Sequence, residues 1–184
     1  MRDFKLQEIT DKKVGILGTG SIGMQIAKRL KAFDAVTIGF NRSGNSAEYF
    51  DKIYKIDAFE GMTGELDVII VALPLNSGSE YIINKNILEK MHSKSVLINI
   101  GRGMSVDTEA LADVLEKGGI MGAALDVFEQ EPLPEDSRLW GLENLLISPH
   151  ICSGSNYMNK RVYDLVYDNL KAFGENGKLI NRIV

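Results

Sequence analysis

The sequence VGILGTGSIG, residues 14–23, decides the fold of this chain. Its first four residues are apolar and suit a buried parallel strand, and a segment with helical periodicity, Met24–Phe33, follows directly. Three glycines between them form a G-x-G-x-x-G pattern. The first allows a tight turn, the second lets a diphosphate approach the backbone, and the third lets helix pack closely on strand. The stretch predicts a dinucleotide-binding loop, although the glycines alone could mark only a tight turn.

The rest of the chain alternates short apolar runs with segments of helical spacing. We expect further strands at residues 36–40, 53–55, 66–73, 96–100, 120–125 and 145–147, and further helices at 81–91, 107–117 and 157–173. Strands that are apolar throughout are typical of a parallel sheet that is buried on both faces. The pattern predicts a Rossmann-type doubly wound parallel sheet in a three-layer α/β/α single domain, with strand order 3-2-1-4-5-6 and a short seventh strand at the edge.

Composition argues against several other classes of protein. The 184 residues suit one α/β domain, and 45% apolar with 25% charged residues is typical of a globular chain. The longest apolar run, Val68–Leu73, is too short to span a bilayer. One cysteine forms no intrachain disulfide, no Cys/His spacing suits zinc, and a net charge of −4 with scattered basic residues argues against a nucleic-acid groove. We expect a cytoplasmic protein that binds no metal, membrane or nucleic acid.

Ligands of a doubly wound sheet bind beyond the carboxyl ends of its strands, near the point where the strand order reverses. Besides the glycine loop, the residues that stand just beyond a predicted strand are Asn41, Pro74, Arg102, Asp126 and His150. Because the carboxyl ends of parallel strands share one edge of the sheet, we expect these residues to meet in one crevice.

The residues after the second predicted strand bear on which dinucleotide is bound. An NAD site usually places an acidic side chain about 20 residues beyond the glycines, where it accepts the ribose hydroxyls of the adenosine. Asn41 stands there instead, followed by Arg42 and Ser43. Without a carboxylate, a 2′-phosphate meets no like charge, and Arg42 can pair with it while Ser43 donates a hydrogen bond. The sequence predicts NADP as the preferred cofactor. If Arg42 points to solvent instead, NAD is possible as well.

Four motifs together resemble the D-isomer-specific 2-hydroxyacid dehydrogenases: GTGSIG at 18–23, INIGRG at 98–103, ALDVFEQEP at 124–132 and SPH at 148–150. The resemblance implies an NAD(P)-dependent oxidoreductase that moves hydride between a nicotinamide and a small 2-oxo or 2-hydroxy acid. The residues at 41–43 are similar to the glyoxylate and hydroxypyruvate reductase branch. The expected cofactor-binding residues are Gly18, Gly20, Ser21, Ile22, Gly23, Asn41, Arg42, Ser43, Leu73, Pro74, Ser79, Ile100, Arg102, Asp126, His150 and Ser153.

By the same resemblance, three residues are expected to be catalytic. Arg102 grips the carboxylate and carbonyl of the substrate, His150 moves the proton, and Glu131 supports the histidine, while Asp126 lies beside the nicotinamide. The residue types suit these tasks, because histidine exchanges protons near neutral pH and an arginine fork holds a carboxylate through two parallel hydrogen bonds. Each residue also has a structural interpretation: a structural histidine, a surface arginine, an ordinary loop acid, or an aspartate that bridges a loop.

Members of that family carry a substrate domain built mostly from residues ahead of the nucleotide-binding segment, and here only thirteen residues precede Val14. We expect a lead-in at 1–13, an NAD(P)-binding domain at 14–155, and a helix and tail at 156–184 that would return to a missing substrate domain. The expected partners are a small 2-oxo acid, that domain and a second copy in a homodimer. The chain alone is expected to be inactive. The alternative is a non-catalytic dinucleotide-binding or sensing module, because corepressors of this family use the fold in that way.

Overall fold

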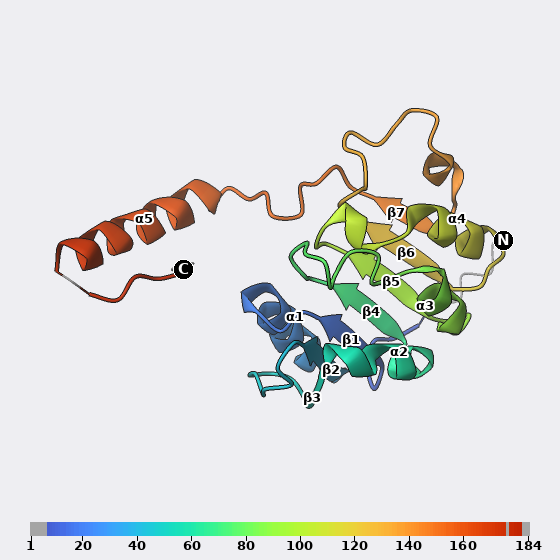
Figure 1. The fold of residues 1–184 in the computed structure, drawn as a ribbon, viewed down its shortest axis with the longest axis horizontal. Coiled ribbons are helices and arrows are strands. Elements are labelled where there is room, and N and C mark those ends of the chain that lie inside the picture. Colours follow the sequence, from blue (N-terminus) through green and yellow to red (C-terminus); the bar gives the residue numbers. More distant parts are fainter. Residues whose placement is uncertain (1–6, 176, 182–184) are drawn as a thin grey trace. The chain divides into compact units, whose positions relative to one another are not determined.

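Figure 1 shows the computed structural model, which describes residues 7–175 and 177–181. The chain divides into two compact units, one that ends at His150 and one that starts at Ile151. The first unit holds a seven-stranded sheet in the order β3-β2-β1-β4-β5-β6-β7, and all neighbouring strands are parallel. The strands are β1 (Lys13–Leu17), β2 (Val36–Asn41), β3 (Lys52–Lys55), β4 (Val68–Val71), β5 (Val96–Asn99), β6 (Gly122–Leu125) and β7 (Leu145–Ile147). The predicted strand order is confirmed.

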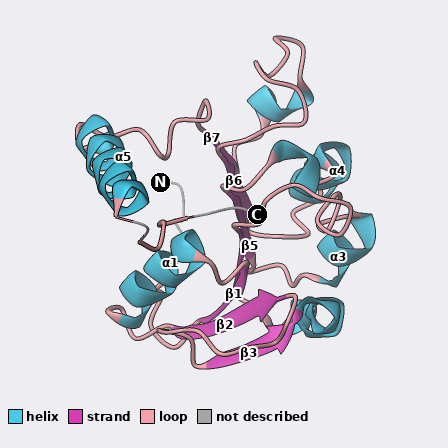
Figure 2. Ribbon diagram, turned by 60° about the vertical axis from the view of Figure 1, so that its left-hand side comes forward, coloured by secondary structure: helices cyan, strands magenta, loops and turns pink. Residues whose placement is uncertain are grey.

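Helices cover both faces of this sheet. The first unit contains α1 (Ser21–Lys31), α2 (Phe59–Met62), α3 (Lys85–Lys90) and α4 (Thr108–Glu116), with short 3-10 turns η1 (Ile56–Ala58), η2 (Thr63–Glu65), η3 (Gly103–Ser105) and η4 (Arg138–Gly141). Seen along the sheet in Figure 2, α1 lies on one face, whereas α3 and α4 lie on the other. The predicted three-layer α/β/α arrangement is therefore confirmed.

Side chains from both faces of the strands form two apolar clusters. Leu17 of β1 and Leu97 of β5 are fully buried in the larger cluster, which includes Leu111 of α4. Ile16, the neighbour of Leu17, is fully buried in the smaller cluster with Ala27 of α1. Each such aliphatic side chain contributes about 1.5–3 kcal/mol by leaving water. The sheet is thus packed on both faces, and the loops at its carboxyl edge can carry ligands.

Three helices differ from the sequence predictions. Helix α1 begins at Ser21 rather than Met24, so the last glycine of the motif already lies within it. Helix α3 begins at Lys85 rather than at Tyr81, because the Asn84 side chain caps it by accepting the backbone N–H of Ile87 at 3.1 Å. The four-residue helix α2 was not predicted, because a single turn has no helical periodicity to detect.

The second unit contains α5 (Met158–Gly174), which has no buried residue of its own. Asn169 joins the tail to this helix, since its Oδ1 accepts the N–H of Ile180 at 2.7 Å and its Nδ2 donates to the carbonyl of the same residue at 3.2 Å. More than half of each side chain is exposed for Val162, Tyr163, Val166, Tyr167, Leu170 and Phe173. Among the described residues, no helix combines the length and apolar character that crossing a bilayer requires.

Candidate functional site

The glycine loop after β1 has the geometry that its sequence predicts. Gly18 has φ +101°, and a Cβ there would lie 2.7 Å from the carbonyl oxygen of Ala72. Gly23 packs against the carbonyl of Gly18 so closely that no Cβ fits. A Cβ on Gly20, in contrast, would meet no heavy atom within 4 Å. The first and third glycines are thus required by the fold, whereas the space beside the second is free for a ligand.

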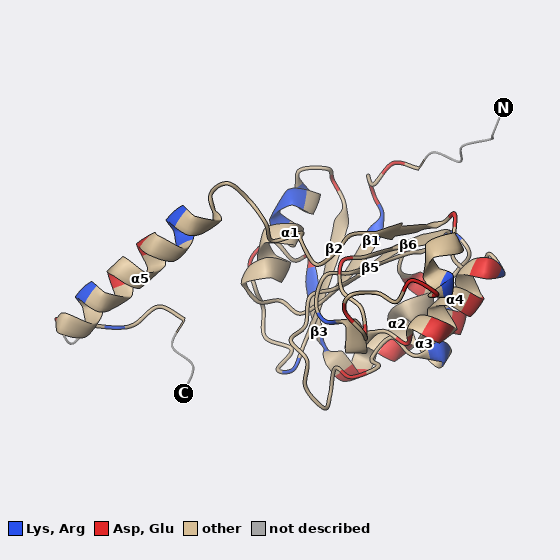
Figure 3. Cartoon of the chain, turned by 90° about the horizontal axis from the view of Figure 1, so that it is seen from above, with Lys and Arg blue, Asp and Glu red and all other residues tan. Residues whose placement is uncertain are grey.

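The N-terminus of α1 supplies the groups that a diphosphate needs. The first hydrogen bond within the helix runs from the N–H of Met24 to the carbonyl of Gly20 at 2.9 Å, so the N–H groups of Ser21, Ile22 and Gly23 have no acceptor within the helix. No acidic side chain lies in the first turn, and the basic ones lie in the last. Figure 3 shows the basic end of α1 in blue. Free N–H groups and an open Gly20 fit a dinucleotide diphosphate.

A cavity of about 420 Å³ lies next to this loop, between the end of β2 and the segment after β4. Five expected cofactor residues line it together: Asn41, Arg42, Leu73, Pro74 and Ser79. Ile56 and the 76–78 turn also line it, and neither was predicted.

Ser43 and Ser79 differ from the other expected residues of this region. Ser43 is exposed and is not among the residues that line the cavity. Ser79 is buried, and its hydroxyl donates to the carbonyl of Pro74 at 2.7 Å, so this hydroxyl shapes the turn.

His150 and Glu131 form a hydrogen-bonded pair at the carboxyl edge of the sheet. Nδ1 of His150 lies 2.7 Å from Oε2 of Glu131, while Oε1 of Glu131 accepts the N–H of Phe128 at 3.0 Å. The hydrogen bonds from His150 and from Phe128 hold the pKa of Glu131 below its ordinary value of 4.5, so this acid is ionised at neutral pH. Because Nδ1 faces Glu131, Nε2 is the ring nitrogen through which a proton could pass to a ligand.

Backbone contacts also fix the position of His150. Its φ is +54°, and its N–H donates to the carbonyl of Asp126 at 2.8 Å. Asp126 itself is 4% exposed, and its Oδ1 accepts the hydroxyl of Ser148 at 2.6 Å. That contact agrees with the loop-bridging interpretation of Asp126, and its place beside a nicotinamide stays a prediction.

Arg102 is exposed at the end of β5, where its Nη1 donates to the carbonyl of Gly101 at 2.7 Å. The turn that carries it is held by Asn99, a fully buried amide whose Nδ2 donates to the carbonyl of Arg102 at 2.9 Å and whose Oδ1 accepts the N–H of Gly101 at 3.0 Å. Asn99 was not among the residues predicted from the sequence. Its signal was one polar residue at the end of an otherwise apolar strand.

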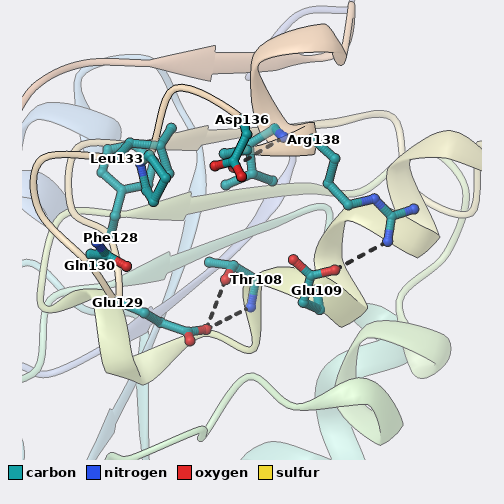
Figure 4. A pocket seen from close by; sticks show the side chains of 11 residues that line it. Thr108, Glu109, Phe128, Glu129, Gln130, Leu133, Asp136 and Arg138 are labelled. Atoms are coloured by element: carbon teal, nitrogen blue, oxygen red, sulfur yellow. Dashed lines mark hydrogen bonds and ion pairs between the residues drawn. The ribbon is translucent and has the colours of Figure 1, made fainter.

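The turn of Arg102 and the loop of Glu131 are packed against each other. Gly103 lies against the Phe128–Glu129 peptide, where no Cβ could be accommodated. The carboxylate of Glu129 accepts the N–H and the hydroxyl of Thr108 at 3.0 and 2.8 Å, which ties the same loop to the start of α4. Figure 4 shows this contact at a neighbouring cavity of about 400 Å³.

The expected residues are thus only partly brought together by contacts. Glu131, His150 and Asp126 form one connected group, and the cavity residues form another. Ile100 is half-buried, and its N–H donates to the carbonyl of Val71 at 3.1 Å. Ser153 belongs to the second unit.

A doubly wound sheet with this glycine loop and helix N-terminus defines the dinucleotide-binding class of α/β proteins. The chain belongs to the D-isomer specific 2-hydroxyacid dehydrogenase family: the sequence model of that family's NAD binding domain matches residues 1–152.

Individual relatives agree with this assignment. A hydroxyphenylpyruvate reductase of Plectranthus scutellarioides is 38% identical over 187 residues, which cover 99% of this chain and 57% of the relative. A glyoxylate/hydroxypyruvate reductase A of Arabidopsis thaliana is also 38% identical, over 96% of this chain and 55% of the relative. The chain therefore spans about half the length of these curated relatives.

Solved structures of the family share the fold. The NADPH-dependent glyoxylate/hydroxypyruvate reductase of Sinorhizobium meliloti, solved in complex with NADP and sulfate, matches with a TM-score of 0.88 at 30% identity. The match covers 100% of this chain and 58% of that one.

Proposed function

We propose that this chain is the nucleotide-binding part of an NADPH-dependent reductase of small 2-oxo acids, with Arg102, Glu131 and His150 as its catalytic residues. The observation that carries this proposal is the 2.7 Å contact between His150 Nδ1 and Glu131 Oε2. His150 follows β7 and the glycine loop follows β1, and because all strands are parallel both lie at the same edge of the sheet. A proton donor at the dinucleotide edge suits the reduction of a carbonyl group.

Each catalytic residue has a separate task in this reaction. Arg102 binds the substrate carboxylate through its guanidinium fork and so orients the neighbouring carbonyl. Glu131, ionised, pairs with Nδ1 of His150 and so fixes the orientation of the ring. His150 gives its Nε2 proton to the carbonyl oxygen, which becomes the hydroxyl of the 2-hydroxy acid. The dihydronicotinamide, when bound, supplies the hydride to the carbonyl carbon.

The residues that would hold the cofactor follow from the shape of the site. The Gly18–Gly23 loop, with Ser21 and Ile22, would hold the diphosphate, and the cavity lined by Asn41 and Arg42 would hold the adenosine. An uncharged Asn41 in place of the usual acid, followed by the positive side chain of Arg42, supports a preference for NADPH over NADH. Ile100, Asp126 and Ser153 remain predicted contacts, and NAD remains possible.

A second part of the protein completes the site in this proposal. We assign the nucleotide site to residues 14–155, and to residues 156–184 a return to a substrate domain like those that the family resemblance implies. The apolar side chains exposed on α5 support this role, because a stripe of that kind is normally covered. Holding substrate against hydride donor supplies up to about 7–11 kcal/mol of catalysis, so the chain alone should turn over negligibly. A homodimer and a cytoplasmic location remain predictions from the sequence.

The proposal is tested with the chain alone and with a substrate domain of a relative added or fused. The chain alone should bind NADPH and should oxidise it negligibly in the presence of glyoxylate or hydroxypyruvate. The assembled protein should turn over, and His150→Ala should abolish turnover while NADPH binding persists. Robust turnover by the chain alone would contradict the need for a second part. NADPH binding without turnover in the assembled protein would favour the sensing module.

A further inference from the structure

The side chain of Asn41 builds the turn that follows β2. Its Oδ1 accepts the N–H of Gly44 at 2.6 Å and the hydroxyl of Ser43 at 3.4 Å, and its Nδ2 donates to the carbonyl of Asn45 at 3.0 Å. Gly44 has φ +75°, a conformation that glycine adopts without strain. One amide therefore closes a tight turn in which Arg42 and Ser43 remain exposed.

The same amide joins this turn to the glycine loop. Nδ2 of Asn41 also donates to Oγ1 of Thr19 at 2.8 Å. Thr19 packs on β2 as well, because a Cβ on Gly39 would lie 2.7 Å from its methyl carbon. The amide of Asn41 can make two donor and two acceptor contacts, and all of them are made within the protein.

We propose that Asn41 is a positioning residue of the cofactor site and that its side chain does not contact the ribose. It holds Arg42 and Ser43 in place for a 2′-phosphate, and through Thr19 it couples that position to the loop that would hold the diphosphate. This inference rests on the proposed preference for NADPH. The proposal makes Thr19 a determinant of cofactor specificity, although its side chain carries no charge.

An aspartate at this position could not take over the same role. Its carboxylate could accept the N–H of Gly44, but it has no proton to donate to the carbonyl of Asn45, which would then face a carboxylate oxygen. Asn41→Asp should therefore weaken NADPH binding without creating an NADH site, although an acid at the end of this strand is what NAD sites carry.

The experiment measures the dissociation constants of NADPH and NADH by fluorescence titration for the wild type and three variants. Thr19→Val keeps the methyl group and removes the hydroxyl, whereas Thr19→Ser keeps the hydroxyl. Asn41→Asp and Thr19→Val should weaken NADPH binding by about threefold to tenfold, the effect of one lost hydrogen bond, and NADH binding by less than about twofold. Thr19→Ser should keep the wild-type ratio of the two constants.

If Asn41 and Thr19 only stabilised the fold, their variants would not change the ratio of the NADPH and NADH dissociation constants. Equal losses for both cofactors in Thr19→Val, or tighter NADH binding by Asn41→Asp, would overturn the proposal.

Hydrogen exchange of the Gly44 amide separates this inference from the proposed function, because it needs no cofactor. The amide should be protected in the wild type and in Thr19→Ser, and should exchange about tenfold faster in Thr19→Val, where its acceptor Asn41 loses an anchor. If the wild type binds both cofactors equally while this pattern holds, the NADPH preference fails and the positioning role stands. If protection is the same in Thr19→Val, the positioning role fails, whichever cofactor is preferred.

Discussion

Gly103 and Phe128 are in direct backbone contact, which locks the turn of Arg102 against the loop of Glu131. Two catalytic candidates that are far apart in the sequence are therefore held by one small residue that cannot carry a side chain.

We expect Gly103→Ala to lower the free energy of unfolding by about 1–3 kcal/mol, because the added methyl group must push two loops apart. Urea denaturation followed by circular dichroism measures the change. Gly61→Ala is the matched control, since a Cβ there meets no heavy atom within 4 Å and the residue lies in helix α2. The control should be neutral or stabilising by about 0.5–1 kcal/mol. Equal stability of the two variants would contradict the packing described.

Gly20→Ala is expected to leave the fold intact and to weaken both NADPH and NADH. The backbone at this residue, φ −73° and ψ −165°, suits any amino acid, and the added methyl group would enter the space assigned to the diphosphate. Affinity should fall by about tenfold or more, which corresponds to about 1.4 kcal/mol. Titration with each cofactor, with the melting curve as a check on folding, decides this. Unchanged affinity would show that the diphosphate lies elsewhere.

Arg42→Ala should act on one cofactor only. A charge-assisted hydrogen bond is worth about 1.5–3 kcal/mol, so NADPH binding should weaken by about ten- to a hundredfold, while NADH binding stays nearly the same. The loss of NADPH affinity caused by Arg42→Ala should be smaller at high salt, because Arg42 is exposed and its charge is screened. Lys28→Ala is the control, because it also removes a basic side chain but lies in the last turn of α1. It should leave both affinities unchanged. Equal weakening of both cofactors by Arg42→Ala would contradict a phosphate contact.

The pair of Glu131 and His150 should make the free energy of unfolding depend on pH in the acid range. The folded state holds the pKa of Glu131 below its ordinary value of 4.5. As the pH falls, the unfolded chain therefore takes up the proton before the folded chain does. The contribution of this group is therefore complete above about pH 5 and is lost as the pH falls through the lower, folded pKa. The difference in unfolding free energy between wild type and Glu131→Gln should narrow over that range in denaturation curves recorded at several pH values. A constant difference would show that the hydrogen bonds to Glu131 do not favour its ionised form.

Much of the fold could be predicted because its strands are short, apolar and separated by helices. The strand at Leu145–Ile147 was predicted with its observed bounds, and the others to within a few residues. The glycine motif hid the start of α1, because its last glycine is used for packing inside the helix. Tyr81 was wrongly placed in a helix. It has a left-handed backbone, φ +45°, and its N–H is bonded to Met104.

The site could be predicted where its residues stand within recognisable sequence motifs. The motif at 124–132, which contains Glu131, and the motif at 148–150, which ends at His150, indicated a pair, and Nδ1 of His150 lies 2.7 Å from Oε2 of Glu131. Thr19 and Asn99 were missed because their roles depend on partners that only the folded chain brings near. Nothing in the letters GTG shows that the middle residue accepts a hydrogen bond from Asn41, 22 positions later.

The left-handed backbone of His150 has a consequence for how this chain can evolve. A residue other than glycine in that conformation costs of the order of 1–3 kcal/mol, and glycine would relieve much of it. Under the proposed function, His150→Gly removes the proton donor; it relieves the backbone strain but also removes the hydrogen bond to Glu131. Laboratory selection for thermal resistance alone should therefore admit glycine here wherever the relief of strain outweighs that hydrogen bond, whereas selection for turnover should retain the imidazole. The identity of this one residue would then report which of the two pressures had acted.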